Sequence, residues 1–351
     1  MSDNIELVSE KIKAEDSLEA INNLFYEHGW TDGLPIVPPT PERVRLMISG
    51  CKLNAQEEIA ILPPKMGSAT VEKIAINAVM AGCLPEYMSV IIAAVEAVAD
   101  DKFNLLGVQA TTHPCGVLII VNGPISKKLR INSSGNAFGS GNKANATIGR
   151  ALSLVLLNIG GGIPGQIDKS TQGNPCKYTY CVAENEEANP WQPFHVEKGF
   201  HPEDSTVTVF AAEGPHNIND HDSTSGLGIL KTIAATMATA GNNNFIFLSG
   251  EPILMLGPEH SATIAGDGFS KEQVKNYIFK NARLPLAKIS EDHIQYRTKQ
   301  PERYGEFINS QTMPIAKKDD IVVMVLGGAG KHSCFIPTFG LNTMVTKIIK
   351  P

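Results

Sequence analysis

A polar stretch near the middle of the chain gathers the side chains best suited to chemistry. Residues 212–223 read Ala-Glu-Gly-Pro-His-Asn-Ile-Asn-Asp-His-Asp-Ser. Imidazoles can transfer protons or bind a divalent metal, and a neighbouring carboxylate can orient an imidazole. We therefore predict that His216 and His221 act as general base and acid or bind a metal, with Asp220 orienting one ring. The alternative is that His216 is a turn histidine whose ring bonds to the backbone.

A metal at this stretch would have histidine and carboxylate ligands, which suit Zn, Fe, Mn or Ni. The third predicted ligand is Glu184, from the run Glu-Asn-Glu-Glu, where an exposed acidic turn is the alternative. His221 follows His216 by five positions, so the two cannot share a helix face and a loop must bring them together. The chain has no HExxH, paired CxxC, Walker or dinucleotide-binding pattern, so no nucleotide cofactor is expected.

A second reactive group follows an apolar run near the C-terminus. Residues 320–326, Asp-Ile-Val-Val-Met-Val-Leu, predict a buried parallel strand, and a glycine-rich turn follows them. The carboxyl end of such a strand is a usual ligand position, so Lys331, His332 and Ser333 are predicted to close the active site. Cys334 lies near a lysine and a histidine, which would lower its pKa and favour a thiolate nucleophile. The alternative is a buried, inert cysteine after a glycine turn.

A segment rich in glycine and asparagine is predicted to bind the substrate. Residues 131–142 run into a predicted helix, so their backbone N–H groups can meet an anion. Asn132 and Ser133 in this segment, with Arg150 in the helix, are expected to hold a substrate carboxylate. His113, which precedes Pro-Cys and an apolar strand, is a further candidate for substrate binding.

A proline-rich stretch near the N-terminus has two interpretations. Residues 29–40, Gly-Trp-Thr-Asp-Gly-Leu-Pro-Ile-Val-Pro-Pro-Thr, predict a rigid, extended loop. In one interpretation, Trp30 and Asp32 line a substrate pocket. In the other, the loop is a structural brace that joins an N-terminal helix to the body of the protein. Thr40 and Pro41 then predict the start of a helix, with Thr40 as its cap.

The elements that must position these residues repeat along the chain. The apolar helix predicted over residues 73–82 resembles residues 231–241, and the strand predicted over 117–121 resembles 253–256. Each strand is followed by Gly-Pro, and then by an isoleucine, glycines, a phenylalanine and a helix. This shared order favours an internal duplication. Two pseudo-symmetric lobes would place their loops around one cleft, with the 212–223 stretch between them.

We therefore predict an α/β fold with two pseudo-repeated α/β lobes, a helical N-terminal extension and a C-terminal Rossmann-like strand-turn-helix segment. The predicted boundaries are 1–58 for the N-terminal extension with its proline-rich loop, 59–203 for the first lobe, 204–316 for the second lobe and 317–351 for the C-terminal segment.

Composition narrows the class of protein. Apolar residues make up 42% of the 351 residues and charged residues 19%, which is typical of a globular protein with a sizeable core. The net charge of −6 argues against nucleic acid as the main partner. The polar N-terminus does not resemble a signal peptide, and no apolar run approaches the roughly 20 residues that cross a bilayer. The six cysteines lack disulfide-scaffold spacing, so a cytoplasmic protein is expected; a homo-oligomer stays open.

Three stretches resemble a family of bacterial proteins called UGSC-like. They are residues 29–40, Asn145-Ala-Thr-Ile-Gly-Arg150 and Glu213-Gly-Pro-His-Asn217. The family is named for a selenocysteine motif that follows a strand in its short members, and Lys331-His332-Ser333-Cys334 is the counterpart here. Lys331 stands where those members have selenocysteine, and His332 replaces glycine. The selenium implies thiol or selenol redox chemistry in the short members, whereas the resemblance to long members covers most of this chain.

Three functions follow from these patterns. The first is a lyase or hydrolase that acts on a small polar, anionic metabolite in the cleft between the lobes, by metal-assisted or acid/base chemistry. The second is a thiol-dependent oxidoreductase that uses Cys334, and the third is a non-catalytic small-molecule binding protein. Replacing Cys334 with serine would abolish activity only in the second case.

Overall fold

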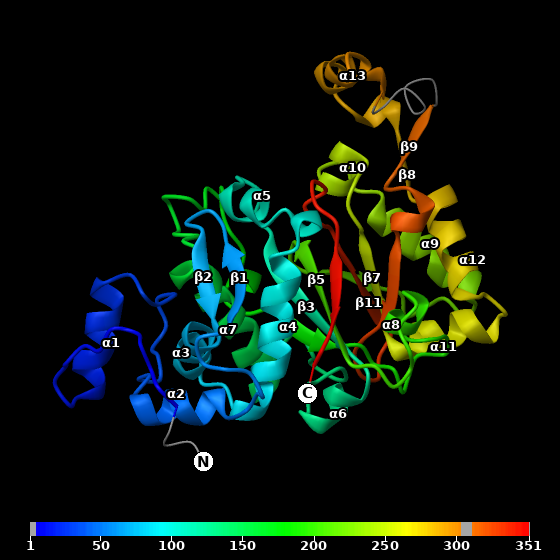
Figure 1. The fold of residues 1–351 in the computed structure, drawn as a ribbon. Helices are drawn as coiled ribbons and strands as arrows, with labels where there is room; N and C mark the ends of the chain where they lie inside the picture. Colours follow the sequence, from blue (N-terminus) through cyan, green and yellow to red (C-terminus); the bar gives the residue numbers. More distant parts are fainter. Residues whose placement is uncertain (1–4, 303–310, 351) are drawn as a thin grey trace.

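The computed structural model describes residues 5–302 and 311–350. Within them the chain forms four layers, in which two four-stranded sheets pack face to face and helices cover the outer face of each sheet (Figure 1). The α/β fold predicted from the sequence is confirmed.

The two sheets have the same strand arrangement, β12-β5-β3-β4 in the first and β6-β11-β7-β10 in the second. In each sheet the central strand, β3 or β7, is parallel to one neighbour, β4 or β10, and antiparallel to the other, β5 or β11. The bounds in the first sheet are β3 (Gly116–Asn122), β4 (Cys181–Ala183), β5 (Thr206–Ala212) and β12 (Val345–Ile348). The bounds in the second sheet are β6 (His216–Asn219), β7 (Ile253–Leu256), β10 (Val322–Val325) and β11 (His332–Ile336).

Three longer helices pack on the outer face of each sheet. Those on the first sheet are α3 (Val71–Ala81), α4 (Met88–Val98) and α7 (Lys143–Asn158). Those on the second sheet are α9 (Gly226–Met237), α11 (Pro258–Gly266) and α12 (Lys271–Asn281). Shorter helices lie in the connections, namely α5 (Leu105–Ala110), α6 (Pro124–Lys128), α8 (Phe194–Glu197) and α10 (Asn243–Phe247).

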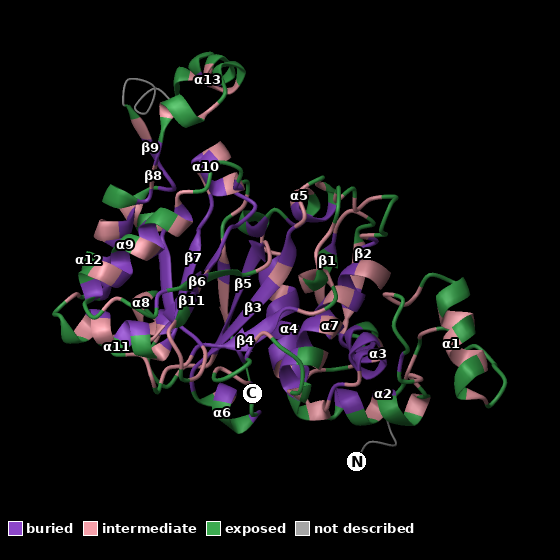
Figure 2. Ribbon diagram, turned by 180° about the vertical axis from the view of Figure 1, so that it is seen from behind, coloured by how far each residue is buried: buried purple, intermediate pink, exposed green. Residues whose placement is uncertain are grey.

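An apolar layer joins the two sheets. Successive side chains of a strand point to opposite faces, so every second residue faces the other sheet. Leu118 and Ile120 of β3 pack in one cluster with Ile253 and Met255 of β7. The residues between them face the helices, as Ile119 does in the cluster with α3, α4 and α7. The strands are consequently buried on both faces, and they form the buried centre of the molecule in Figure 2.

The internal repeat predicted from the sequence is confirmed. Helix α3 precedes β3 in the first half as α9 precedes β7 in the second half. Each central strand ends at a Gly-Pro pair, where α6 or α11 begins with its proline in the first turn. The matching strand arrangement of the two sheets supports an origin by duplication.

The two halves exchange a strand. Strand β6 begins shortly after β5 ends, but β5 belongs to the first sheet and β6 pairs with β11 in the second. Strand β12 follows β11 and crosses in the opposite direction to pair with β5 in the first sheet. The boundary predicted at residue 204 therefore precedes a strand of the first sheet, because β5 pairs with β3.

The predicted strand-turn-helix at the C-terminus is wrong in its last element. Residues 320–326 contain the expected parallel strand, β10, which pairs with β7. The chain then continues as strand β11, which fills the gap between β6 and β7 with antiparallel pairs on both sides. Its buried Phe335 and Ile336 face opposite sides of the sheet and pack in different clusters, as a strand that is covered on both faces requires.

The N-terminal extension and one arm lie outside the four layers. Helices α1 (Leu18–Glu27) and α2 (Pro41–Ile48) and the hairpin of β1 (Glu58–Leu62) and β2 (Gly67–Thr70) precede α3. The predicted cap of α2 is confirmed, because Thr40 accepts a hydrogen bond from the Arg43 N–H and Pro41 opens the helix. A ribbon of β8 (Arg283–Pro285) and β9 (Thr312–Pro314), with α13 (Glu291–Thr298), forms the arm at the top of Figure 1.

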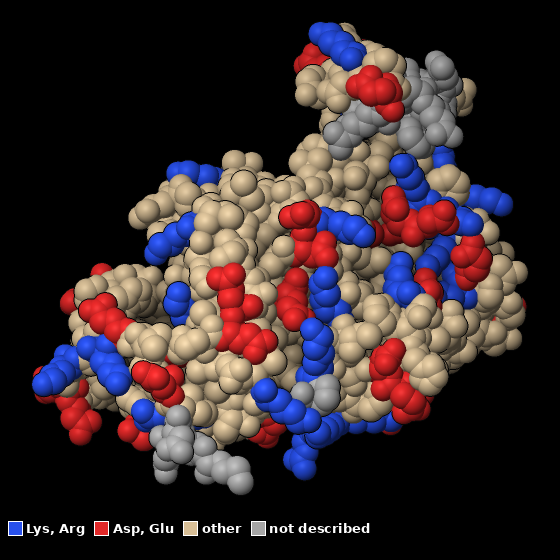
Figure 3. Space-filling view, viewed as in Figure 1, with Lys and Arg blue, Asp and Glu red and all other residues tan. Residues whose placement is uncertain are grey.

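Charged side chains of both signs mix on the surface. Figure 3 shows lysines and arginines beside aspartates and glutamates on the face that it draws. None of the helices in residues 5–302 and 311–350 combines the length and the apolar character that crossing a bilayer requires.

The exchange of β12 can be tested by two alanine variants on this one strand. Val345 is 6% exposed and packs with the helices of the first sheet, whereas Ile348 is 45% exposed. We expect Val345→Ala to lower the free energy of unfolding by about 2 kcal/mol and Ile348→Ala by less than about 1 kcal/mol. Urea unfolding followed by circular dichroism measures both values. Equally small effects would show that β12 is not an integral strand of the first sheet.

Candidate functional site

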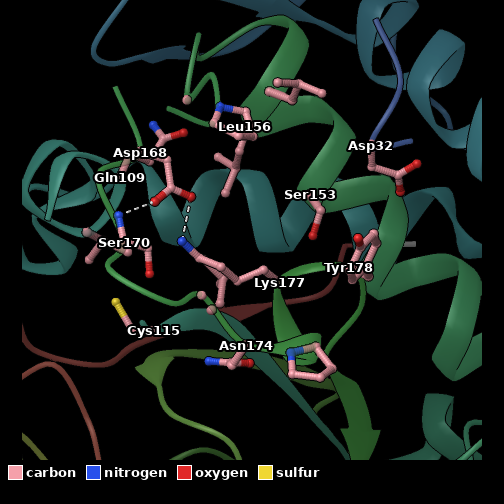
Figure 4. A pocket seen from close by; sticks show the side chains of 18 of the residues that line it. Asp32, Gln109, Cys115, Ser153, Leu156, Asp168, Ser170, Asn174, Lys177 and Tyr178 are labelled. Carbon is pink, nitrogen blue, oxygen red and sulfur yellow. Dashed lines mark hydrogen bonds and ion pairs between the residues drawn. The ribbon is translucent and has the colours of Figure 1, made fainter. Parts of the chain in front are cut away.

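A cavity of about 610 Å³ opens beside the amino end of β3 (Figure 4). Cavities of this size hold small metabolites. Its walls come from α5, from α7, from residues 162–178 and from the proline-rich N-terminal loop. All these segments precede residue 179, so the cavity belongs to the first half of the chain and to the N-terminal extension. It does not lie between the lobes, where the sequence analysis expected a cleft, because an apolar layer packs the two sheets together there.

An ion pair between Asp168 and Lys177 stands at the cavity wall. The Lys177 ammonium lies 2.5 Å from the Asp168 carboxylate, and the side chains are 24% and 21% exposed, respectively. The other oxygen of Asp168 accepts a hydrogen bond from the Ser170 N–H at 3.0 Å. An ammonium has three donors, and Asp168 takes one of those of Lys177. No further partner of this ammonium lies among the residues that the structure describes, so the other donors can bind a ligand.

Two of the side-chain amides that line the cavity bind the backbone. Gln109 donates to the carbonyl oxygen of Pro63, and Asn174 donates to that of Pro114. These two side chains therefore fix the walls. Cys115 also lines the cavity, and burial raises the pKa of its thiol to about 12, so it is protonated at neutral pH.

His113, a predicted substrate-binding residue, lies behind the cavity wall. Its Nε2 is 2.8 Å from a carboxylate oxygen of Glu213, and its ring stacks on Phe339 at 5.7 Å. Its main-chain oxygen accepts a hydrogen bond from the hydroxyl of Ser170, which does line the cavity. The buried Nδ1 has no hydrogen-bond partner among the described residues. The carboxylate can only accept, so Nε2 is the donor, and in the neutral imidazole Nδ1 is then an acceptor.

Arg150 and Asp32, both predicted to bind substrate, bind each other. Two hydrogen bonds of 2.8 Å join the guanidinium to the two carboxylate oxygens, and Arg150 also donates to the carbonyl oxygens of Leu34 and Pro35. Arg150 therefore fastens the N-terminal loop to α7 and is not free for a substrate carboxylate. Burial would raise the pKa of Asp32, but the hydrogen bond and charge of Arg150 outweigh it and lower the pKa.

The proline-rich loop is both a structural brace and a part of the cavity wall. Trp30 stacks on His28 with ring centres 4.4 Å apart, and its main-chain oxygen accepts from Asn158 of α7. These contacts are those of a brace. Thr31 and Asp32 nevertheless line the cavity, so the brace also forms part of its wall.

The loop that contains Asn132 and Ser133 is shaped by its own amides. The Asn132 side chain accepts from the Ser134 N–H and donates to the Gly135 carbonyl, which leaves it no role at the cavity. The main-chain oxygen of Ser133 accepts from the Gly327 N–H at 2.9 Å. The glycine-rich turns of the two halves thus meet through their backbones. Glycine is needed at 328, because a Cβ there would lie 2.9 Å from the Cα of Gly135.

The pairing of β6 with β11 brings His221, Lys331 and His332 together. The rings of His221 and His332 are edge to face, with centres 4.9 Å apart. Lys331 donates to the main-chain oxygen of His221 at 3.0 Å. His216 lies opposite Phe335, at the other end of the β6–β11 ladder from His332. The segments that contain His221 and His332 do meet, as predicted. The histidine beside His221 is His332, however, and not the predicted His216.

Asp220 has a structural role that differs from the predicted one. Its carboxylate accepts from the Ser223 N–H and from the hydroxyls of Ser223 and Thr232, at 2.6–2.9 Å. It therefore orients neither His216 nor His221 and instead fixes the turn before α9.

Asp220 binds the imidazole of His260 through its main-chain oxygen. His260 was not among the site residues predicted from the sequence. Nε2 of His260 donates to the main-chain oxygen of Asp220 at 3.1 Å, so Nδ1 accepts from the Ser333 hydroxyl at 2.8 Å. Ser333 in turn accepts from the Gly257 N–H. These groups are buried, and burial lowers the pKa of His260. The available signal was the position of His260, which follows the second Gly-Pro pair directly after a predicted strand.

Glu184 is part of a buried network in the first half and not of an exposed acidic turn. Its carboxylate accepts hydrogen bonds from Asn122, Asn189 and the Phe194 N–H at 2.6–2.9 Å. Burial raises the pKa of Glu184. In the described part of the chain no three His, Cys, Asp or Glu side chains gather as a metal site. The predicted set of His216, His221 and Glu184 therefore does not form one.

The prediction of a reactive thiolate at Cys334 is wrong. Cys334 lies on the face of β11 that packs between the two sheets. Burial raises the pKa of its thiol to about 12. Desolvation of the sulfur causes this rise in the pKa.

The Asp32–Arg150 pair predicts a pH-dependent stability. We expect Asp32→Asn to lower the free energy of unfolding at pH 7 by about 3 kcal/mol, because Arg150 loses its partner while largely buried. The folded-state pKa of Asp32 is lowered, so this contribution is present above the unfolded pKa of about 4 and is lost as pH falls through the folded value. Urea unfolding of both proteins from pH 7 to pH 2.5 tests this. A difference that does not shrink in acid would contradict the assignment.

Alkylation tests the burial of Cys334. With a pKa of about 12, roughly one thiol in ten thousand is ionised at pH 8. Iodoacetamide at pH 8 should therefore label Cys334 far more slowly in the native protein than in urea. Peptide mass spectrometry after timed quenching measures both rates. Similar rates would restore the thiolate hypothesis.

A scan against models of protein families found no match to this chain, and a search of the curated proteins found none either. The resemblance to UGSC-like proteins therefore remains a prediction from the three stretches quoted above.

Proposed function

We propose that the protein is an enzyme that binds a small metabolite with a carboxylate or similar oxyanion in the cavity beside β3 and acts on it by acid/base chemistry of the lyase or hydrolase type. The observation that carries this proposal is the Asp168–Lys177 pair on the wall of a cavity of about 610 Å³. Its alternative is binding without chemistry, in which the ligand leaves unchanged.

The ammonium of Lys177 and the apolar walls of the cavity support this class of ligand, although Asp168 offsets the charge of Lys177. Lys177 is the cationic side chain among the described lining residues. Asp32 is neutralised by Arg150 and adds little net charge. Apolar side chains, among them Val108, Val117 and Leu156, make up much of the rest of the wall. A ligand with one oxyanion and a compact apolar body would match the ammonium and these walls.

The same ion pair supplies a proton donor and a proton acceptor. An ammonium that binds an oxyanion can give a proton to it, and the adjacent carboxylate can accept one from the ligand. The two groups are partly exposed and 2.5 Å apart, so both can contact one bound molecule. Cys115 is a protonated thiol here and is not assigned a nucleophilic role.

A ligand screen with matched variants tests the proposal. Small carboxylates and phosphate esters are screened by thermal shift, and each hit is measured by calorimetry against Lys177→Met and Lys318→Met. Lys318 pairs with Glu272 on the surface, at 35% and 59% exposure, so its variant removes a similar ion pair away from the cavity. We expect Lys177→Met to weaken binding at least about tenfold, because an oxyanion loses its charged donor, and Lys318→Met to leave it unchanged.

A third variant tests whether the ligand occupies the cavity, while the charge of Lys177 is kept. Ser153 lines the cavity from α7, so Ser153→Leu should fill the cavity and abolish binding with the ion pair intact. Nuclear magnetic resonance of the incubated ligand then distinguishes an enzyme, which converts it, from a binding protein, which returns it. Ligands that bind all three variants equally would overturn the assignment to this cavity.

A further inference from the structure

We propose that His221 and His332 form a binding site for a divalent transition metal, separate from the cavity beside β3. The site lies on the second sheet, where the end of β6 and the start of β11 pair. It involves neither Glu184 nor His216.

The separation of the two rings fits one shared ion. Two imidazoles on a tetrahedral metal, each bound through a nitrogen at about 2.0–2.1 Å, have ring centres about 5 Å apart. The ring centres of His221 and His332 are 4.9 Å apart, and the two ring planes are inclined at 74° to each other. The two ligands come from segments far apart in the sequence, and the β6–β11 ladder sets their distance.

Side-chain amides hold both rings in the tautomer that a metal needs. Nδ1 of His221 is 2.5 Å from the Asn219 oxygen, and Nδ1 of His332 is 3.0 Å from the Asn217 oxygen. An amide oxygen only accepts, so Nδ1 is the donor in each ring, and in the neutral imidazole Nε2 then has the lone pair. Among the described residues neither Nε2 has a hydrogen-bond partner. A second-shell acceptor on the other ring nitrogen is the usual support of a metal-binding histidine.

The backbone makes this arrangement rigid. Asn219 lies directly opposite His332 in the ladder, and Asn217 lies opposite Cys334. Lys331 donates to the main-chain oxygen of His221, which ties the loop after β6 to the start of β11. Imidazole ligands suit Zn, Ni, Cu and Fe. With two protein ligands, water or a small ligand would fill the remaining positions.

Calorimetry with Zn²⁺ and Ni²⁺ on tag-free, chelator-treated protein tests the site. We expect one ion per chain, with His221→Ala and His332→Ala each weakening binding at least about tenfold. Asn217→Ala and Asn219→Ala should weaken it less, as residues that position the rings. His201→Ala is the matched control, because His201 is an exposed histidine of another loop, and it should leave the affinity unchanged.

Three results would overturn the proposal. They are no binding at millimolar metal, binding that survives both histidine variants, and equal loss in His201→Ala. Thermal unfolding without metal shows whether a variant is folded, and a folded His332→Ala protein that binds like the parent is decisive. Lys177→Met should bind the metal normally, so a failure here is distinguishable from a failure of the function proposed for the cavity.

Discussion

The burial of both faces of two sheets is the constraint on which the rest of this structure depends. Side chains of β3 and β7 alternate between the layer that joins the sheets and the layers that face the helices. Apolar residues must therefore occupy nearly every position of the central strands, as they do in β3. Polar groups are left to the ends of the strands and the loops. Both the cavity and the histidine pair lie at such ends.

The exchange of β6 and β12 turns two similar halves into one unit. Each sheet contains a strand from the other half of the chain, so neither sheet is complete without both halves. The exchange also creates the contacts between distant segments. β6 meets β11 only because the chain crosses after β5, and this pairing places His221 beside His332.

Most conspicuous polar residues satisfy one another, which decides where chemistry can occur. Arg150 is paired with Asp32. Ser333 and His260 form hydrogen bonds with each other and with the backbone. Burying a polar group without a hydrogen-bond partner destabilises the fold. Side chains that look reactive in a sequence are therefore often hydrogen-bonded within the structure. Among the described residues, the Lys177 ammonium has donors without a partner, and Nε2 of His221 and of His332 has no hydrogen-bond partner. These are the groups that can bind a ligand or a metal.

The sequence by itself determined the α/β class, the repeat, the strand β10 and the cap of α2, because periodicity, Gly-Pro pairs and capping residues act over a few neighbouring positions. It also identified the segments around His221 and His332. Only the tertiary structure decided that β11 is a strand, that Asp32 faces Arg150 and that the cavity lies within the first half. It likewise decided that Cys334 lies half-buried between the two sheets. Strand partners, ion-pair partners and burial depend on residues up to hundreds of positions away, which no local pattern encodes.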